Sequence, residues 1–213
     1  MFLYWLCMVL GFLPFHIISP YKVIGKKNIK GQKDYIIASN HKSNYDAVML
    51  DYIFARRIRF LAKKELFKTK FSAYFMKNVF GAISIDRDKG LTPSQYKQIV
   101  GVINGRQMLG IFPEGTRNEK DEMQIKGGVC YFAIKYKKPI VPCYIVSKHK
   151  FMKRNYILIG KPFTLSEFYD KKLDSNTLSQ ADGVLLSKIQ QLKEDFKRAE
   201  SERKLVKKIK KQK

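Results

Sequence analysis

The alternation of short apolar runs with segments of helical spacing constrains the fold of this chain more than any other feature. Seven runs have the length and apolar content of β-strands: 21–24, 35–39, 59–62, 82–85, 108–112, 140–146 (interrupted by Pro142) and 155–159. Four segments between them place apolar residues at helical spacing: 46–55, a stretch around 71–79, 92 toward 104, and 129–136. Strands that alternate with helices predict an α/β fold in which a layered mixed sheet is flanked by helices.

The first 21 residues contain no Asp, Glu, Lys or Arg. This segment lacks the basic start and the small-residue cleavage site of a secretory signal, so we expect it to be retained. Gly11 and Pro14 are expected to interrupt its helix, which leaves either a marginal single-pass span or an embedded, monotopic segment. The lysines that follow, from Lys22 to Lys30, predict that the downstream chain lies at the cytoplasmic face of the membrane. A buried core helix is the alternative for so short an apolar run.

Three parts of the chain differ in composition. Residues 1–20 are predicted to be a membrane-associated apolar segment, 21–180 an α/β domain, and 181–213 a C-terminal helix with a basic tail. Apolar residues from Val184 to Phe196 lie at helical spacing, and Lys and Arg dominate the tail after them. The tail fits either an electrostatic tether to an anionic membrane surface or a solvated helix end.

The chain carries 42 Lys and Arg against 18 Asp and Glu, a formal charge of +24. Such a charge indicates anionic partners, among which nucleic acid, an acidic membrane face and polyanionic small substrates all qualify. The basic and aromatic residues form none of the known RNA or DNA reading motifs, so no nucleic-acid partner is predicted. Cys7, Cys130 and Cys143 lack CxxC or CxxH spacing and are interpreted as reduced packing residues.

The segment Asn40-His-Lys-Ser-Asn-Tyr-Asp46 directly follows a predicted strand. On one straight helix His41 and Asp46 would face different sides, since five residues turn a helix by about 140° beyond one full turn. The two side chains can meet if His41 lies in the loop and Asp46 enters the following helix. A carboxylate bound to one ring nitrogen leaves the other nitrogen to accept a proton, which suits a general base. The spacing does not resemble a metal site.

A second cluster, 112–118 with the sequence FPEGTRN, ends another apolar strand. Strand ends are where ligands bind in α/β folds. Gly115 permits a close backbone approach, and Arg117 offers a planar fork that matches phosphate. An ordinary turn is the alternative reading of Pro-Glu-Gly. Two further segments also lie at the ends of predicted strands. GAISIDR ends one strand and carries Arg87, and KPIVP begins another strand with two prolines.

The order NHxxxxD, GxxxIDR, FPEGTR and PIVP, from Asn40 to Pro142, resembles the glycerolipid acyltransferase family that includes the 1-acylglycerol-3-phosphate acyltransferases. The resemblance covers roughly residues 24–159, and the first and third blocks together are highly specific. Asn118 and Ser84 depart from the residues common in the family and leave the acceptor preference open.

The resemblance implies transfer of a fatty acyl group from acyl-CoA or acyl-acyl carrier protein to the sn-2 hydroxyl of 1-acyl-sn-glycerol 3-phosphate, giving phosphatidic acid. It implies that His41 is the general base, that Asp46 orients it, and that the hydroxyl attacks the thioester directly. No GxSxG elbow for an acyl-enzyme is present. The motif positions assign the acceptor and its phosphate to Glu114, Gly115, Thr116, Arg117, Arg87 and, more weakly, Lys64.

The partners that the resemblance implies are the acyl thioester donor, the lysophospholipid acceptor and an anionic membrane surface, with acyl carrier protein as one candidate donor. No metal or cofactor is expected beyond the thioester co-substrate. Within the family, another lysophospholipid, glycerol 3-phosphate or an amino-acid lipid is an alternative acceptor. From other classes, the alternatives are a non-catalytic basic membrane adaptor and a nucleic-acid-binding protein. The intact set of His41, Asp46, Glu114 and Arg117 argues against a silent adaptor.

Overall fold

The computed structural model describes residues 2–31, 34–86, 89–115, 125, 128–146, 152 and 154–211, except the side chains of 204–211. Within these residues the strands are β1 (Tyr21–Ile24), β2 (Ile36–Ser39), β3 (Ile58–Lys63), β4 (Ile83–Ile85), β5 (Met108–Ile111), β6 (Ile140–Val146) and β7 (Asn155–Ile159). The α-helices are α1 (Phe2–Ile18), α2 (Asp46–Phe54), α3 (Lys70–Tyr74), α4 (Pro93–Asn104), α5 (Gly128–Lys135) and α6 (Ser175–Lys211). Short turns of helix are η1 (Lys26–Ile29), η2 (Lys64–Phe67), η3 (Phe75–Val79) and η4 (Ser166–Phe168).

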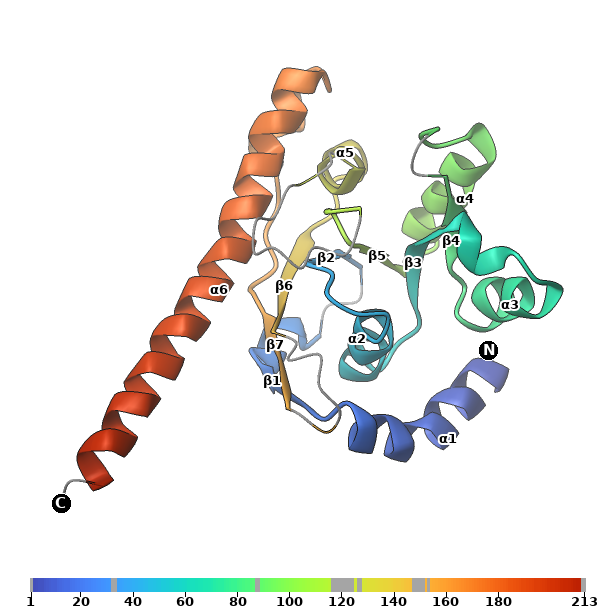
Figure 1. Cartoon of the computed structure of the whole chain (residues 1–213). Helices are drawn as coiled ribbons and strands as arrows, with labels where there is room; N and C mark the ends of the chain where they lie inside the picture. The colour runs from blue at the N-terminus through green and yellow to red at the C-terminus, as the bar shows by residue number, and fades with distance from the viewer. Residues whose placement is uncertain are drawn as a thin grey trace.

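The strands form one sheet in the order β1-β7-β6-β2-β5-β3-β4 (Figure 1). Neighbouring strands are parallel, except that β6 and β7 are antiparallel. The sheet is therefore mixed and flanked by helices, as the sequence predicted. Because β2, β5, β3 and β4 are adjacent and parallel, the segments that follow them leave from the same edge, where α/β folds bind ligands.

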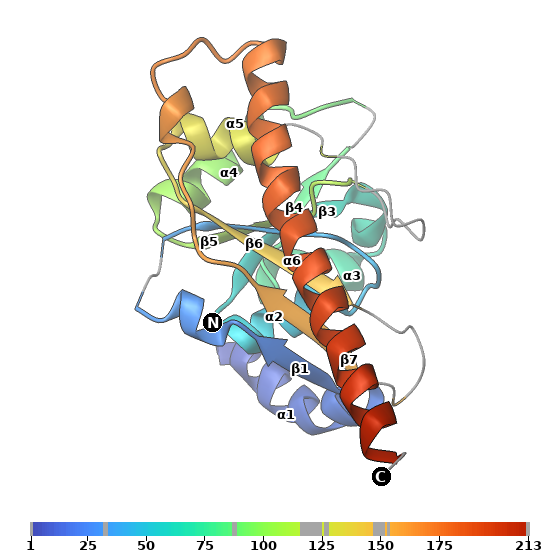
Figure 2. The same ribbon diagram turned by 90° about the vertical axis from the view of Figure 1, so that its left-hand side faces the viewer.

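Helices cover both faces of the sheet (Figures 1 and 2). One buried cluster joins the sheet to α2, and a second joins it to α4, α5 and α6. Successive residues of a strand point to opposite faces, and β2 shows this directly, since Ile36 belongs to one cluster and Ile37 to the other. This double burial explains why the central strands read as continuous apolar runs in the sequence.

Pro142 does not interrupt its strand, in contrast to the expectation from the sequence. β6 is continuous, and Pro142 lies in register with Ala38 of β2. The carbonyl of Pro142 accepts a hydrogen bond from the Gly160 N–H over 2.8 Å. The proline nitrogen therefore also faces the β7 side and not β2, so the missing N–H leaves the pairing of β6 with β2 intact and limits the ladder with β7 to the residues from Cys143 onward.

The expectation that Gly11 and Pro14 interrupt the N-terminal helix was also wrong, because α1 is continuous. The Tyr52 hydroxyl of α2 donates to the Met8 carbonyl over 2.8 Å. Gly11 makes room for that hydroxyl, which lies 3.2 Å from where a Cβ would stand. Packing against the domain, with Tyr4 and Met8 buried, stabilises a helix that Pro14 would weaken in isolation. Within the described residues no helix has both the length and the hydropathy that crossing a membrane requires.

The C-terminal helix α6 begins earlier than the apolar pattern from Val184 indicated. Asp174 precedes it and accepts the Thr177 N–H over 2.8 Å, which caps its first turn. Ala181, Leu185 and Ile189 are buried in the same cluster as α4 and α5. The C-terminal part of α6 projects past the sheet (Figure 1).

Candidate active site

Asn40, the first residue after β2, fixes the loop that carries the predicted histidine. Its side chain is buried, and its Oδ1 accepts the Ile145 N–H over 2.6 Å while its Nδ2 donates to the Ile145 carbonyl over 3.0 Å. The amide thereby extends the pairing of β2 with β6 by one step. No role for Asn40 was predicted from the sequence, although a polar residue at the end of a buried strand needs buried partners.

His41 lies in the loop and Asp46 is the first residue of α2, so the two side chains meet. His41 Nδ1 is 2.9 Å from Asp46 Oδ2, and the same oxygen accepts the N–H groups of Lys42 at 2.6 Å and Ser43 at 2.7 Å. Asp46 is fully buried, whereas the His41 side chain is 14% exposed. With Nδ1 donating to the carboxylate, Nε2 is the ring nitrogen that can accept a proton.

A stack of two aromatic rings packs against one face of the imidazole. The Phe112 ring stacks on His41 with centroids 4.2 Å apart and an interplanar angle of 17°. Phe60 stacks on Phe112 in turn, at 5.2 Å and 8°. Gly110 allows this stack, because a Cβ at that position would lie 2.3 Å from the Phe60 ring. Phe112 belongs to the second sequence motif, but its contact with His41 was not predicted from the sequence.

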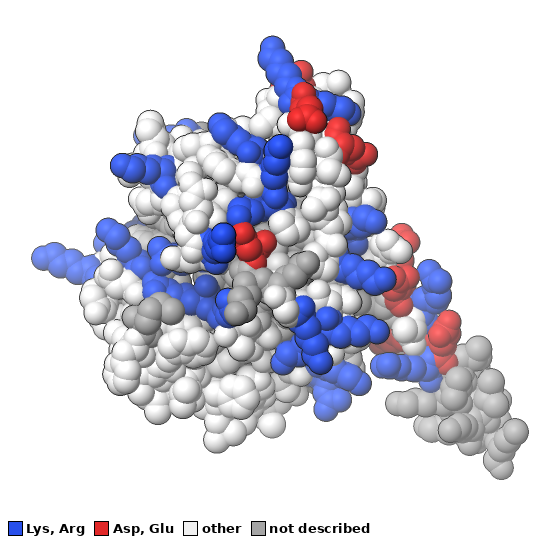
Figure 3. All heavy atoms as spheres, turned by 180° about the vertical axis from the view of Figure 1, so that it is seen from behind, with Lys and Arg blue, Asp and Glu red and all other residues white. Residues whose placement is uncertain are grey.

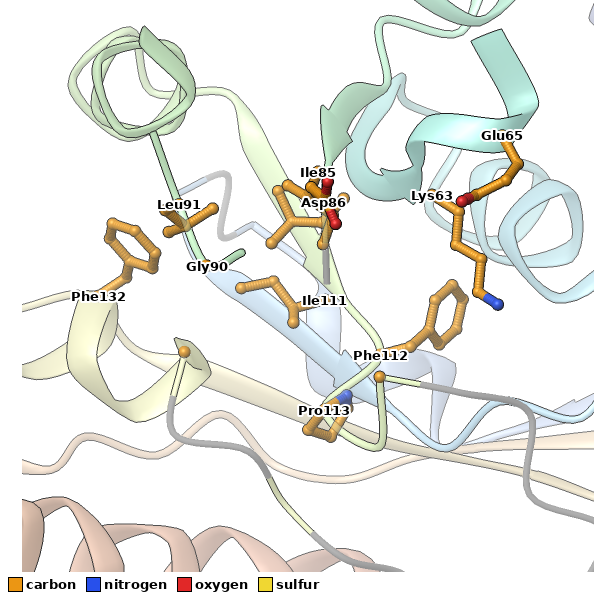
Figure 4. Close-up of a pocket in the computed structure, with 13 residues that line it drawn as sticks. Lys63, Glu65, Ile85, Asp86, Gly90, Leu91, Ile111, Phe112, Pro113 and Phe132 are labelled. Carbon is orange, nitrogen blue, oxygen red and sulfur yellow. The ribbon is translucent and has the colours of Figure 1, made fainter. Parts of the chain in front are cut away.

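A pocket of about 460 Å³ opens beside Phe112 at the carboxyl ends of β3, β4 and β5. Figure 4 shows Lys63 and Phe112 at one end and Leu91 and Phe132 at the other. The lining is mainly apolar: Leu61, Ile85, Leu91, Ile111, Phe112, Pro113 and Phe132, with Lys63, Glu65 and Asp86 as charged members. A cavity of this size and lining accommodates an extended apolar ligand with a few polar contacts.

The second motif forms a tight turn against this pocket. The Gly115 N–H donates to the Phe112 carbonyl over 3.1 Å, which closes the turn directly after β5. Gly115 has φ +69°, in the left-handed region where an L side chain would be strained, and it lines the pocket. Glu114 is buried beside it. The turn that Pro-Glu-Gly indicated as the alternative to a ligand site is therefore present, and it lies next to the stacked rings of His41 and Phe112.

The residues predicted to bind phosphate are described only in part. Lys64, the first residue of η2, forms an ion pair with Asp86 at 2.7 Å and is 54% exposed. Its partner Asp86 lines the pocket, as do the neighbouring residues Lys63 and Glu65. Arg87, Thr116 and Arg117 lie outside the described residues.

Comparison with known proteins agrees with this geometry. The acyltransferase family model matches residues 20–146. The chain is 31% identical over 153 residues to the 1-acyl-sn-glycerol-3-phosphate acyltransferase of Bacillus subtilis, a match that covers 69% of this chain and 75% of that protein. It is 34% identical to the Saccharomyces cerevisiae enzyme of the same name, over 58% of this chain but only 42% of that protein.

Among solved structures, the chain is similar to the 1-acyl-sn-glycerophosphate acyltransferase PlsC from Thermotoga maritima. The TM-score is 0.63 with 19% sequence identity, and the match covers 89% of this chain and 79% of that one. At this identity the structural likeness shows the fold, while the family model spans more than half of the chain and includes both clusters of the site. The chain therefore belongs to the acyltransferase family, and it is an enzyme of the O-acyltransferase class.

Proposed function

We propose that the chain acylates the sn-2 hydroxyl of 1-acyl-sn-glycerol 3-phosphate, with acyl-CoA or acyl-acyl carrier protein as donor, and so forms phosphatidic acid. The observation that carries this proposal is an imidazole, oriented by a buried carboxylate, beside an apolar pocket. The relatives named 1-acyl-sn-glycerol-3-phosphate acyltransferase support the choice of acceptor.

In the proposed reaction, His41 Nε2 takes the proton of the acceptor hydroxyl as its oxygen attacks the thioester carbonyl carbon. The new C–O ester bond forms, the C–S bond breaks, and the carrier leaves as a thiolate that can take up the proton from the imidazolium. Asp46 stabilises the imidazolium, because its Oδ2 already accepts the Nδ1 proton. Asp46 itself is held by two backbone N–H groups, so it need not reorient during transfer.

The pocket suits the apolar part of a lipid substrate. Phe112 belongs both to its lining and to the stack on His41, which places the apolar cavity next to the base. We propose that the acceptor headgroup lies at the Lys63 end of the pocket, where Lys64 supplies positive charge. Glu114, Gly115, Thr116, Arg117 and Arg87 complete the proposed acceptor site. A phosphate ester is matched by such cationic and backbone donors.

We further propose that α1 rests in the membrane interface in the monotopic arrangement. Its buried stripe, Tyr4 and Met8, faces the domain, and its other side presents uncharged apolar residues to solvent, among them Val9 and Leu10 at 69% exposure and Phe2 at 81%. A soluble domain rarely exposes so continuous an apolar helix face. Both lipids of the reaction would then reach the site from the bilayer.

Product analysis by mass spectrometry tests the proposed reaction. The purified chain is offered 1-acyl-sn-glycerol 3-phosphate with acyl-CoA and then with acyl-acyl carrier protein, and phosphatidic acid is the expected product with at least one donor. Glycerol 3-phosphate and a zwitterionic lysophospholipid serve as competing acceptors. A product formed preferentially from either competitor would contradict the proposed acceptor while leaving acyl transfer intact.

A further inference from the structure

The segment from η2 to α3 exposes large apolar side chains although it belongs to the α/β domain. Phe71 is 73% exposed, Tyr74 52% and Leu66 46%. The Phe71 ring also contacts the Phe75 ring, with centroids 4.8 Å apart, so one side of the exposed Phe71 ring packs against the domain. Single exposed apolar residues are ordinary, but three on one short segment indicate a surface that meets an apolar partner.

This segment is joined to the N-terminal helix. Tyr4 and Met8 of α1 share a buried cluster with Val79, the last residue of η3, and Phe75 and Phe80 pack against it. Figure 1 shows the start of α1 next to α3. The exposed apolar face of α1 and the exposed side chains of α3 therefore belong to neighbouring elements that one partner can contact together.

The charge around the segment indicates which partner fits. Lys68 and Lys70 are exposed on it and Lys77 is exposed on the adjoining η3, whereas Glu65 is the single acidic residue from η2 to η3. Figure 3 shows an uncharged area over the part of the molecule that holds α1, bordered by Lys and Arg. An apolar area with a lysine border complements a bilayer whose headgroups are anionic, because the lysines reach the phosphates while the aromatic rings enter the interface.

We propose that η2 and α3 form a second contact with an anionic phospholipid bilayer, beside α1. The inference rests on the proposed acylation of a membrane lipid, and it adds a route for the acceptor. Lys63 and Glu65, at the start of this segment, line the pocket beside Phe112. The proposed bilayer contact thus adjoins the mouth of the pocket, and a lysolipid enters the pocket beside Phe112 directly from the leaflet.

Fluorescence quenching in vesicles tests this contact without any turnover. Trp5 of α1 is the single tryptophan, so Trp5→Phe combined with Phe71→Trp places the only indole on α3. In vesicles of phosphatidylcholine and phosphatidylglycerol with brominated acyl chains, we expect this indole to be quenched about as strongly as Trp5 of the parent. Trp5→Phe with Tyr169→Trp is the matched control, since Tyr169 packs against the buried cluster of α4, α5 and α6 and not against the clusters that hold α1, and its indole should stay unquenched.

Vesicle co-sedimentation gives a second measurement. Phe71→Ser with Tyr74→Ser should weaken partitioning about tenfold, because two aromatic side chains no longer leave water. Lys68→Ala with Lys70→Ala should weaken it by a similar factor on anionic vesicles only. Lys172→Ala with Lys188→Ala removes the same charge from exposed sites beside and on α6 and should change partitioning little.

An indole on α3 that escapes quenching while Trp5 is quenched would overturn the second contact and leave α1 as the membrane element. If neither indole is quenched, the bilayer contact of both elements fails. Equal weakening by the two lysine pairs would show that overall charge, and not this surface, drives binding. None of these outcomes bears on whether the enzyme makes phosphatidic acid from dispersed substrates, so the inference and the proposed reaction fail separately.

Discussion

The two ends of α2 each hold a buried carboxylate, and their surroundings differ. Asp46, at the start of the helix, accepts N–H groups from His41, Lys42 and Ser43. Asp51, one and a half turns later, accepts the Ile58 N–H over 2.9 Å. Burial raises the pKa of Asp51 from its ordinary value of 3.8 to about 8, against the opposing effects of that hydrogen bond and of Arg57.

Two carboxyl groups that are both buried on one helix therefore differ in their chemical properties, because their surroundings differ. At the N-terminus of α2, N–H groups of His41, Lys42 and Ser43 bind the Asp46 carboxylate, which is thereby placed to orient the His41 imidazole. Near the C-terminus, the interior around Asp51 favours the neutral acid. The first end serves the proposed chemistry, whereas the second end lies beneath α1, where Tyr52 binds the Met8 carbonyl.

The largest effect is expected at the base. His41→Ala should lower kcat about a thousandfold or more, because no other group replaces the proton acceptor. The melting temperature should stay near that of the parent, since the Lys42 and Ser43 N–H groups still bind the Asp46 carboxylate. His16→Ala on α1, measured in the same steady-state assay, is the matched control and should retain activity.

Asp46→Asn should lower kcat about a hundredfold, a smaller loss than at His41. The amide oxygen can still accept the Lys42 and Ser43 N–H groups, but it carries no charge to stabilise the imidazolium. KM for the acceptor should change little, because Asp46 does not reach the pocket lining. A change in KM alone would assign Asp46 to acceptor binding instead.

Asp51→Asn tests the other end of the helix through stability and not through activity. A folded-state pKa raised above 3.8 means that the folded protein binds more protons than the unfolded chain between about pH 4 and 8, so stability falls as pH rises through that window. The substitution should flatten this slope and raise the free energy of unfolding at pH 8 by as much as about 5 kcal/mol, because the neutral amide carries no charge to bury.

Denaturant unfolding at several pH values measures this effect, with the exposed Asp170→Asn as control. A slope that is the same in the parent and in Asp51→Asn would show that the Asp51 carboxylate is already ionised in the folded protein at neutral pH.

The smallest effect is expected at the ring stack. Phe112→Leu keeps an apolar side chain but removes the ring that lies 4.2 Å from His41, and kcat should fall about fivefold. Phe60→Leu removes the outer ring of the stack, which touches Phe112, and should lower kcat less. A larger loss at Phe60 would mean that the stack acts through packing of β3 and not through the imidazole.

The strands and the His41–Asp46 pair could be predicted from the sequence because each depends on residues that are close together in the chain. Strand 155–159 and strand 21–24 match β7 and β1, because an apolar run of that length has few other structures available. His41 and Asp46 lie on one loop-helix unit, so five residues of sequence were enough to propose their contact. The segment expected to be helical from 92 toward 104 likewise matches α4, and the Thr92 side chain caps its start by accepting the Gln95 N–H.

Features that depend on distant contacts could not be predicted in this way. Asn40 binds the backbone of Ile145 in another strand, and the Phe112 ring reaches His41 only because β5 pairs with β2. The continuity of α1 through Gly11 and Pro14 depends on its packing against α2. In each case the local sequence either gives no indication of the observed structure or disfavours it, and a contact with a distant residue stabilises that structure.

Single-turnover acyl transfer by His41→Ala, with and without added imidazole, tests the proton relay most directly. The account predicts almost no transfer from acyl thioester to lysophosphatidate without imidazole, and a recovery that increases with imidazole concentration as the free base enters beside Phe112 and Asp46. Transfer by His41→Ala at the parent rate without imidazole would contradict the role of this imidazole as the base.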